Sequence, residues 1–254
     1  MRFVKMQGAG NDYVYVNGFT ERVEDPNALA IAMSEPHFGV GADGLILILP
    51  SERADFRMRM FNKDGREGAM CGNGARCVGR FVYEQGLTDR TSFTLETGGG
   101  IREIWLDVAD GEVRGVRVDM GAPQAYRREK DRAFVSMGSL HMVYRVEEDP
   151  FAWKDFDRIG GPMCEAEDAN IEYVQVLSPE KLRMRVYERG SGETLACGSG
   201  ACASAVAMQR DGACDRRVKV EMRGGTLEIE LCESDEHVLM TGPAVTVFEG
   251  VWKG

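Results

Sequence analysis

Two short stretches, Met70–Ala75 (MCGNGA) and Ala196–Ala201 (ACGSGA), decide the fold because they are copies of one motif. The two cysteines, Cys71 and Cys197, are 126 positions apart. Other pairs match in the same ungapped register: Arg57–Arg59 with Arg183–Arg185, and Gly98-Gly99 with Gly224-Gly225. A shift of about half the chain indicates an internal duplication, so the chain consists of two copies of one structural unit.

The duplication predicts two domains, spanning residues 1–122 and 123–254. The segment between the copies, Ala122–Arg132, is polar and contains Pro123, which is typical of a linker between domains. The N-terminal domain carries Cys71, and the C-terminal domain carries Cys197.

Each copy reads as strands around one long helix. Alternating apolar and polar residues predict four strands: Arg57–Asn62, Ser92–Glu96, Leu182–Glu188 and Val218–Met222. Helical sequence follows each cysteine, over 75–85 and 199–209, and the second of these helices has almost no polar face, so we expect it to be buried. A further surface helix is expected over 149–159. The predicted fold class is therefore mixed α/β (α+β), with two pseudo-symmetric domains, each a β-shell or barrel around a central helix.

The composition is ordinary for a globular enzyme and leaves a small-molecule substrate open. The 254 residues are 43% hydrophobic and 28% charged, with a formal net charge of −10. No basic cluster is present, which argues against nucleic acid as a partner. The longest apolar run, Leu45–Leu49, is too short to cross a membrane, and the N-terminal sequence lacks the pattern of a secretory signal. We therefore expect a cytoplasmic protein with no membrane partner.

The seven cysteines do not suggest a disulfide framework, because their number is odd and the chain is long. Most are expected to be reduced and buried. One alternative is a non-catalytic zinc-binding or ligand-binding protein, in which Cys71 and Cys77 join Cys197 and Cys202. The spacings within these pairs are looser than those of zinc knuckles, and both second cysteines lie in predicted helices.

Each of Cys71 and Cys197 lies in a glycine-rich turn that opens a helix. Glycines permit the close approach of a ligand, and the N–H groups at a helix start favour a carboxylate. The positive end of the helix dipole is expected to lower the pKa of the adjacent thiol.

Two equivalent helix starts that face one another would place one thiol on each face of a bound α-carbon. One thiolate could then remove the α-proton while the opposite thiol delivers another, which inverts the stereocentre. The helix N–H groups would stabilise the charge that develops on the carboxylate. The sequence thus predicts an acid/base pair formed by Cys71 and Cys197.

At these residues the chain resembles the diaminopimelate epimerase family. The resemblance covers nearly the whole chain and includes these segments: Met6–Asp12, Gly39–Asp43, Phe61-Asn62, Cys71–Arg76, Ala169–Ile171, Arg185–Gly190, Ala196–Ala201 and Thr241–Ala244. Isolated CGxG pieces would indicate only the wider superfamily, which includes enzymes similar to proline racemase.

The resemblance implies a stereoinversion at an amino-acid α-carbon that needs neither pyridoxal phosphate nor a metal. It implies conversion of LL-diaminopimelate to meso-diaminopimelate, a precursor of lysine and peptidoglycan. It also implies a homodimer, and a last strand that crosses over to complete the N-terminal domain.

The resemblance assigns roles to individual residues. Cys71 and Cys197 are the acid/base pair, with His141 expected beside Cys71 and Glu188 beside Cys197. Backbone groups at the two helix starts hold the carboxylate: Gly72, Asn73, Gly198 and Ser199. The remaining substrate-binding residues are Asn11, Asn62, Ser139, Asn170 and Arg189, with Arg189 on the distal carboxylate.

The self-comparison indicates that an originally symmetric site has become unequal. Asn62 occupies the register of Glu188, and Asn11 falls near His141 if one gap is allowed. One half therefore keeps neutral amides where the other supplies ionisable groups, as an asymmetric substrate would require.

One segment departs from the family. The usual Gly-Asn-Pro-His reads Gly138–His141 (GSLH) here, so Ser139 and Leu140 replace an amide and a proline. Retention of Asn62, Asn170 and Arg189 favours diaminopimelate. The altered segment leaves open the alternative of a racemase for another amino acid, such as histidine or a broad set.

Overall fold

The computed structural model describes residues 1–254, which divide into two compact units. Unit 1 comprises Met1–Val118 together with Gly242–Gly254, and unit 2 comprises Asp119–Thr241. The sequence places the boundary after residue 122, whereas the contacts divide the chain after Val118 and group the C-terminal segment with unit 1. None of the helices combines the length and apolar character that a membrane-spanning segment needs.

The strands of unit 1 pair in one continuous order, β18-β1-β2-β3-β4-β6-β7-β8. The pairs β2–β3 and β4–β6 are parallel, and the others are antiparallel. The bounds are β1 Arg2–Gly8, β2 Asn11–Asn17, β3 Gly44–Leu49, β4 Phe56–Asn62, β5 Glu67–Gly68, β6 Ser92–Thr97, β7 Gly100–Ala109, β8 Glu112–Asp119 and β18 Val245–Val251, with helices α1 Pro26–Ser34 and α2 Gly72–Glu84.

Unit 2 repeats this topology in the order β9-β10-β11-β12-β13-β15-β16-β17. Its parallel pairs, β11–β12 and β13–β15, fall at the equivalent places. The bounds are β9 Ala125–Arg128, β10 Arg132–Ser136, β11 Leu140–Val146, β12 Asn170–Ser178, β13 Lys181–Glu188, β14 Gly192–Glu193, β15 Arg217–Met222, β16 Gly225–Leu231 and β17 Val238–Gly242, with α3 Asp157–Glu167, α4 Gly198–Arg210 and a short 3₁₀ helix, η1, Pro150–Ala152. The predicted fold class, a duplicated α/β shell, is therefore confirmed.

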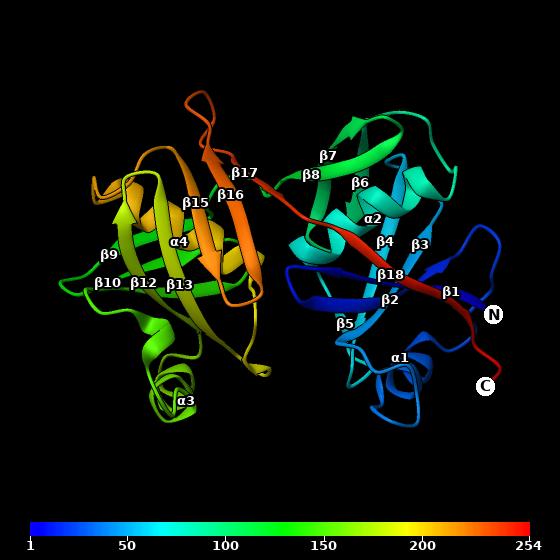
Figure 1. Ribbon diagram of the computed structural model, residues 1–254, viewed down its shortest axis with the longest axis horizontal. Coiled ribbons are helices and arrows are strands. Elements are labelled where there is room, and N and C mark those ends of the chain that lie inside the picture. The colour runs from blue at the N-terminus through cyan, green and yellow to red at the C-terminus, as the bar shows by residue number, and fades with distance from the viewer. The chain divides into compact units, whose positions relative to one another are not determined.

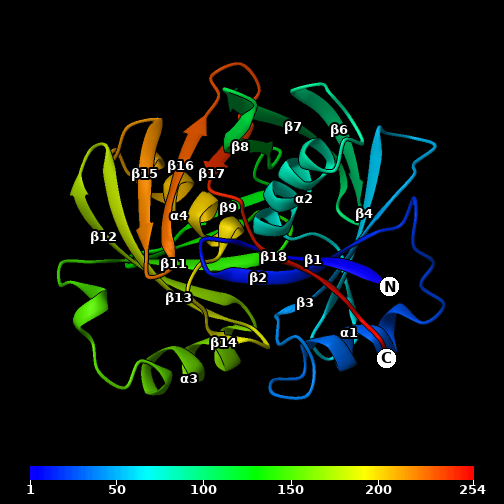
Figure 2. The same cartoon turned by 45° about the vertical axis from the view of Figure 1, so that its right-hand side comes forward.

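Helices α2 and α4 form the centres of the two units (Figures 1 and 2). From Gly200 to Met208, every residue of α4 is buried. Alanine, glycine, serine and cysteine dominate this helix, and their small side chains let the surrounding strands approach closely. In α2 the apolar residues Val78, Phe81 and Val82 are buried. Each central helix thus presents its N-terminus at a fixed place within its own shell.

The helices α1 and α3 connect the parallel strand pairs β2–β3 and β11–β12. Parallel neighbours require a crossover connection, and a helix is its usual form. The prediction of a helix over 149–159 was wrong: Asp149 caps only the short η1, and the α-helix begins at Asp157. Helix α1, capped by Asp25 and opened by Pro26, was not predicted.

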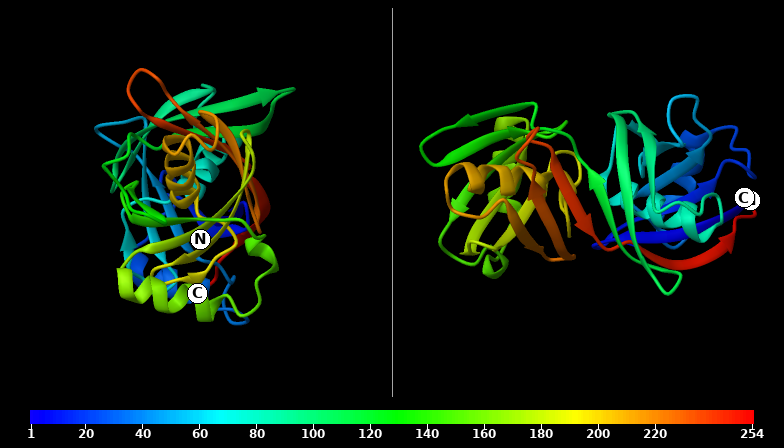
Figure 3. Two further views of the ribbon diagram at one scale, coloured as in Figure 1. Left: turned by 90° about the vertical axis from the view of Figure 1, so that its left-hand side faces the viewer. Right: turned by 90° about the horizontal axis from the view of Figure 1, so that it is seen from above.

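The strand β18 completes unit 1, although it is the last strand of the chain. It pairs antiparallel with β1, from Arg2 opposite Val251 to Gln7 opposite Val245 (Figures 1 and 3). In unit 2 the equivalent place beside β10 is filled by β9, which directly precedes it. In unit 1 this place beside β1 is filled by β18, from the other end of the chain.

Candidate functional site

Cys71 caps the N-terminus of helix α2 in unit 1. Its sulfur accepts a hydrogen bond from the backbone N–H of Gly74 over 3.3 Å. The thiol donates to Oδ1 of Asn11, also over 3.3 Å. Asn11 is itself held by a 2.7 Å bond from its Nδ2 to Oδ2 of Asp43. The amide of Asn11 is therefore fixed with its oxygen toward the thiol, an orientation that depends on Asp43 as an acceptor.

The other predicted residues of unit 1 lie at the same helix start or at the end of β4. Gly72 and Asn73 are buried in the first turn of α2, and Oδ1 of Asn73 accepts from the guanidinium of Arg76 at 2.9 Å. The first turn of any helix carries N–H groups that its own ladder does not use, which suits a carboxylate. Asn62 is the last residue of β4 and is exposed.

Cys197 has the same place in unit 2, at the N-terminus of helix α4. Its sulfur accepts from the backbone N–H of Gly200 at 3.4 Å and lies 3.5 Å from Oγ of Ser199. Gly198 is buried and Ser199 is partly buried. With an exposed fraction of only 5%, Cys197 is more deeply buried than Cys71.

Glu188, the last residue of β13, interacts with Cys197. Burial raises the pKa of the Glu188 carboxyl, while hydrogen bonds with Thr194 and Cys197 lower it. The pKa of the Cys197 thiol is raised well above its usual value, first by burial and then by the charges of Glu188 and Glu172. The bond from Gly200 lowers this pKa, but the effect is smaller than that of burial. The prediction of a lowered thiol pKa is therefore wrong for Cys197, which is protonated at neutral pH.

Replacing Glu188 with glutamine should make Cys197 more reactive toward iodoacetamide. Loss of the neighbouring negative charge makes the thiolate less unfavourable, so the pKa of the thiol falls and the thiolate fraction at a fixed pH rises. We expect alkylation of Cys197 at pH 8 to accelerate roughly tenfold, measured by mass spectrometry of the peptide. Glu147→Gln, at a side chain 90% exposed in the same unit, is the control. An unchanged alkylation rate in the Glu188 variant would contradict the account.

His141 lies on β11 and is completely buried. Its Nε2 is 3.1 Å from Oγ of Ser139, and its Nδ1 is 2.7 Å from Oε1 of Glu172. The structure thus brings Ser139 and His141 together and adds Glu172, which was not predicted. The self-comparison could have identified Glu172, because this charged residue stands at the position that the apolar Ile46 occupies in the first copy. His141 and Cys71 belong to different units, so their pairing stays a prediction.

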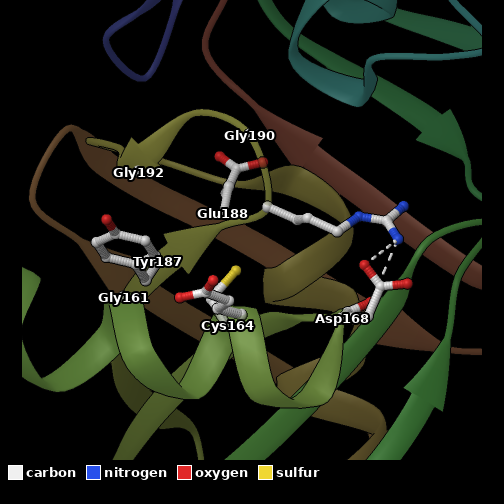
Figure 4. A pocket seen from close by; sticks show the side chains of 9 residues that line it. Gly161, Cys164, Asp168, Tyr187, Glu188, Gly190 and Gly192 are labelled. Carbon is white, nitrogen blue, oxygen red and sulfur yellow. Dashed lines mark hydrogen bonds and ion pairs between the residues drawn. The ribbon is translucent and has the colours of Figure 1, made fainter.

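Arg189 lines a cavity of about 490 Å³ beside α3, and Asn170 is hydrogen-bonded to Arg189. Oδ1 of Asn170 accepts from the backbone N–H of Arg189 at 2.8 Å, so this amide holds the backbone at Arg189. The guanidinium of Arg189 pairs with Asp168 at 3.0 Å and is 57% exposed. The cavity is lined by Gly161, Cys164, Glu165, Asp168, Tyr187, Glu188, Arg189, Gly190 and Gly192 (Figure 4). The lining of the cavity therefore contains one cationic side chain, Arg189, together with the acidic side chains of Glu165, Asp168 and Glu188.

The strand registers show which residues are equivalent in the two units. Leu45 pairs with Phe61 as Ile171 pairs with Tyr187, so Asn62 and Glu188 occupy the same strand position, as the self-comparison suggests. Asn11 falls near the position of His141, as the self-comparison predicts, but it is not the direct counterpart. Val14 pairs with Leu45 as Met142 pairs with Ile171, which makes Tyr13 the counterpart of His141 and Asn11 the counterpart of Ser139. The gap needed in the alignment is therefore two residues.

The cysteines considered for zinc do not stand in a ligand cluster. Cys77 and Cys202 are completely buried inside α2 and α4. Burial raises the pKa of Cys77 to about 11. No three His, Cys, Asp or Glu side chains of the chain come close enough together to form a metal site.

The sequence matches the model of a known protein family and curated proteins of the same name. The model of the diaminopimelate epimerase family matches residues 3–126 and 133–247. Two curated relatives named diaminopimelate epimerase are each 47% identical: one from Acetivibrio thermocellus, over 98% of both chains, and one from Parabacteroides distasonis, over 100% of this chain and 98% of the relative. A relative of the same name from Methanococcus maripaludis is 43% identical over 98% of this chain and 99% of its own.

Comparison of the structure with solved structures shows the same fold at low identity. A phenazine biosynthesis protein of the PhzF family from Bacillus anthracis gives a TM-score of 0.77 at 19% identity, over 98% of both chains. A probable proline racemase from Agrobacterium radiobacter gives 0.78 at 15% identity, over 99% of this chain and 92% of that one. Sequence and fold agree, and the chain is an isomerase that belongs to the diaminopimelate epimerase family.

Proposed function

We propose that the chain converts LL-diaminopimelate to meso-diaminopimelate by proton transfer between the substrate and two thiols, Cys71 and Cys197. The observation that carries the proposal is the duplicated setting: each cysteine caps the central helix of its own unit through an equivalent bond from Gly74 or Gly200. Stereoinversion needs an acid and a base on opposite faces of one carbon. Two copies of one thiol-bearing helix start meet that requirement if both contact the same substrate.

The proposed roles follow the two helix starts. The backbone N–H groups at Gly72, Asn73, Gly198 and Ser199 bind the α-carboxylate and stabilise the negative charge that develops as the α-proton leaves. Cys197, whose pKa is raised, enters the reaction as the thiol that delivers a proton. Cys71 is then the base that removes the α-proton in that direction.

The remaining roles belong to ionisable and amide side chains. His141 is proposed to act beside Cys71, and Glu188 acts beside Cys197 and balances the substrate ammonium. The amides of Asn11, Asn62 and Asn170 and the hydroxyl of Ser139 are proposed to hold the substrate. A precursor of lysine would thus be bound through polar contacts along its whole length.

The distal carboxylate distinguishes diaminopimelate from smaller amino acids, and Arg189 is its proposed partner. The guanidinium of Arg189 is 57% exposed and is bound by Asp168, through both the carboxylate and the backbone oxygen of that residue. It can exchange these contacts for a carboxylate of the substrate. The 43–47% identity to relatives named for diaminopimelate favours this substrate over histidine or a broad set. The Ser139-Leu140 segment alone favours the broader alternative.

Arg189→Met should raise the KM for LL-diaminopimelate by roughly 10-fold to 100-fold. A hydrogen bond to a charged group contributes about 1.5–3 kcal/mol, and Met keeps the length of the side chain without its charge. The change is measured by chiral chromatography of initial rates. Arg145→Met, on a 44% exposed arginine of β11, is the control. A KM equal to that of the wild type would remove Arg189 from the substrate site.

The function itself is tested by incubating the purified protein with LL-diaminopimelate and, separately, with a panel of L-amino acids that includes histidine. We expect meso-diaminopimelate to form at a rate far above that of any other D-product. Conversion of histidine or of many amino acids at comparable rates would support the broader racemase instead. Absence of any conversion would overturn the proposal.

We also propose that the chain acts as a homodimer. Strand β18 carries apolar side chains that are 38–63% exposed, namely Val245, Val247, Phe248 and Val251. An exposed apolar row of this kind is costly in water and is typical of a surface covered by a partner. Sedimentation equilibrium should give twice the chain mass of 28.1 kDa, whereas a monomer at micromolar concentration would contradict the proposal.

A further inference from the structure

The buried pair of His141 and Glu172 lies beneath the helix start that carries Cys197. Both side chains have an exposed fraction of 0%, and Nδ1 of His141 is 2.7 Å from Oε1 of Glu172. They come from the neighbouring parallel strands β11 and β12. A Cβ added to Gly200 would stand 2.7 Å from Oε1 of Glu172, so the carboxylate packs against the first turn of α4.

Unit 1 shows that the fold does not require this pair. In the equivalent strand positions it has Tyr13 and Ile46, which follow from the registers β2–β3 and β11–β12. Ile46 packs against the start of α2 as Glu172 packs against α4, because a Cβ at Gly74 would stand 2.7 Å from its Cδ1. The same architecture is thus built once with an apolar side chain and once with a carboxylate.

The carboxylate is costly for the stability of unit 2. Its Oε2 is buried and has no hydrogen-bond partner. An unpaired buried polar atom destabilises the folded state, and a buried charge does so more strongly. An apolar residue, as in unit 1, would avoid this cost. A buried group that the fold does not need points to a function in catalysis.

The groups that face the pair are those of the candidate site. Ser139 lies on the Nε2 side of the His141 ring at 3.1 Å. The charge of Glu172 raises the pKa of both Cys197 and Glu188, and the charge of His141 lowers that of Glu188. Burial and, to a smaller extent, the charge of Glu172 also raise the pKa of Cys164 of α3. Glu172 therefore acts on the candidate site indirectly. It is hydrogen-bonded to His141 and packs against the first turn of α4, which Cys197 caps.

We propose that Glu172 is a positioning residue that holds the His141 ring in one orientation, with the proton on Nδ1 and with Nε2 directed to Ser139. The inference rests on the proposed function, in which His141 acts in proton transfer. A carboxylate accepts from Nδ1–H, so Nε2 is left to accept a proton or to give one up. His141 can then change its protonation at Nε2 without breaking its bond to Glu172.

The ring nitrogens of His141 can be observed directly by ¹⁵N NMR. The chain has only three histidines, His37, His141 and His237, so replacing His37 and His237 in turn assigns the signals. In the wild type we expect His141 to carry its proton on Nδ1. Glu172→Gln should shift the His141 signals, lower kcat by about 10-fold to 100-fold and leave KM nearly unchanged. Glu172→Asp should recover part of kcat.

A second histidine–carboxylate pair supplies a matched control. Nδ1 of His237 is 2.7 Å from Oδ2 of Asp119 in the same unit, with the His237 side chain 40% exposed. Asp119→Asn should shift the signals of His237, leave those of His141 in place and leave kcat unchanged. A loss of kcat in this variant equal to that in Glu172→Gln would show a general effect on unit 2 and would overturn the inference.

Three further results separate the inference from the proposed function. A wild-type His141 protonated mainly on Nε2 would overturn the inference without any variant having to fold. A Glu172→Gln protein with wild-type kcat and unchanged His141 signals would also overturn it. A wild type that inverts no amino acid would defeat the proposed function, while the NMR measurement would still decide whether Glu172 orients the ring.

Discussion

Replacing Cys71 or Cys197 with alanine abolishes stereoinversion in our account, with a loss of at least about 10³-fold in kcat. In the proposed mechanism each thiol performs a proton transfer that the other cannot take over, because the two act on opposite faces of the α-carbon. General acid/base groups typically contribute about 10²-fold to 10⁴-fold, and here the missing group blocks every turnover. Initial rates measured by chiral chromatography give the effect.

A cysteine outside the proposed site is the control for these variants. Cys232→Ala, at a partly exposed position directly after β16, should keep the wild-type rate. Circular dichroism should show that all three variants fold alike. A Cys71 or Cys197 variant that keeps full activity would contradict the two-thiol scheme, whereas folded but inactive variants would support it.

Deleting Gly242–Gly254 should unfold unit 1. The deletion removes β18 and its six paired positions on β1, as well as the backbone oxygens of Pro243 and Ala244. These oxygens accept from Arg76 and Arg80 of α2, and Arg76 is completely buried. At about 0.5–1.5 kcal/mol for each hydrogen bond, the loss is on the order of 5 kcal/mol, comparable with the whole stability of many domains.

Thermal unfolding followed by circular dichroism measures this effect. We expect the truncated chain to be insoluble or to lose part of its cooperative transition, and to be inactive. Deleting only Lys253 and Gly254, which follow β18, should leave the melting temperature almost unchanged. A cooperative wild-type transition after the longer deletion would show that unit 1 does not depend on its C-terminal strand.

The duplication is the part of the structure that the sequence predicts best. Its ungapped register places the helix starts at Cys71 and Cys197 and the strands before and after them. The register fails toward the N-terminus of each copy, because the connections between β2 and β3 and between β11 and β12 differ in length. For this reason Tyr13, and not Asn11, turns out to be the counterpart of His141.

The crossover helices were harder to predict because neither has a strong pattern. Helix α3 contains Pro162 and the pair Gly160-Gly161, which disfavour helix in its interior. Pro150 and Asp149 gave a helix-start signal, but only η1 follows it. Close packing of α3 on β13, where Gly160 lies against Tyr187, favours the helix at 157–167, and a local sequence window does not contain this contact.

The protonation of the thiols depends on burial, which a motif does not reveal. The sequence shows that Cys197 opens a helix, and a helix dipole lowers the pKa of a thiol. It does not show that Cys197 is 5% exposed or that Glu172 and Glu188 stand close to it. Removal from water and two negative charges outweigh the dipole, so this thiol is the proton donor in the proposed direction.

The most direct test of the central claim is the isotope content of substrate and product early in the reaction in deuterated water. If two thiols act on opposite faces of the α-carbon, the product gains a deuteron from one thiol, and the α-proton of the substrate leaves on the other thiol. At low conversion we expect nearly all meso-diaminopimelate to carry α-deuterium, and the remaining LL-diaminopimelate to retain its α-proton. Product that retains the original α-proton would indicate a single base and would contradict the account.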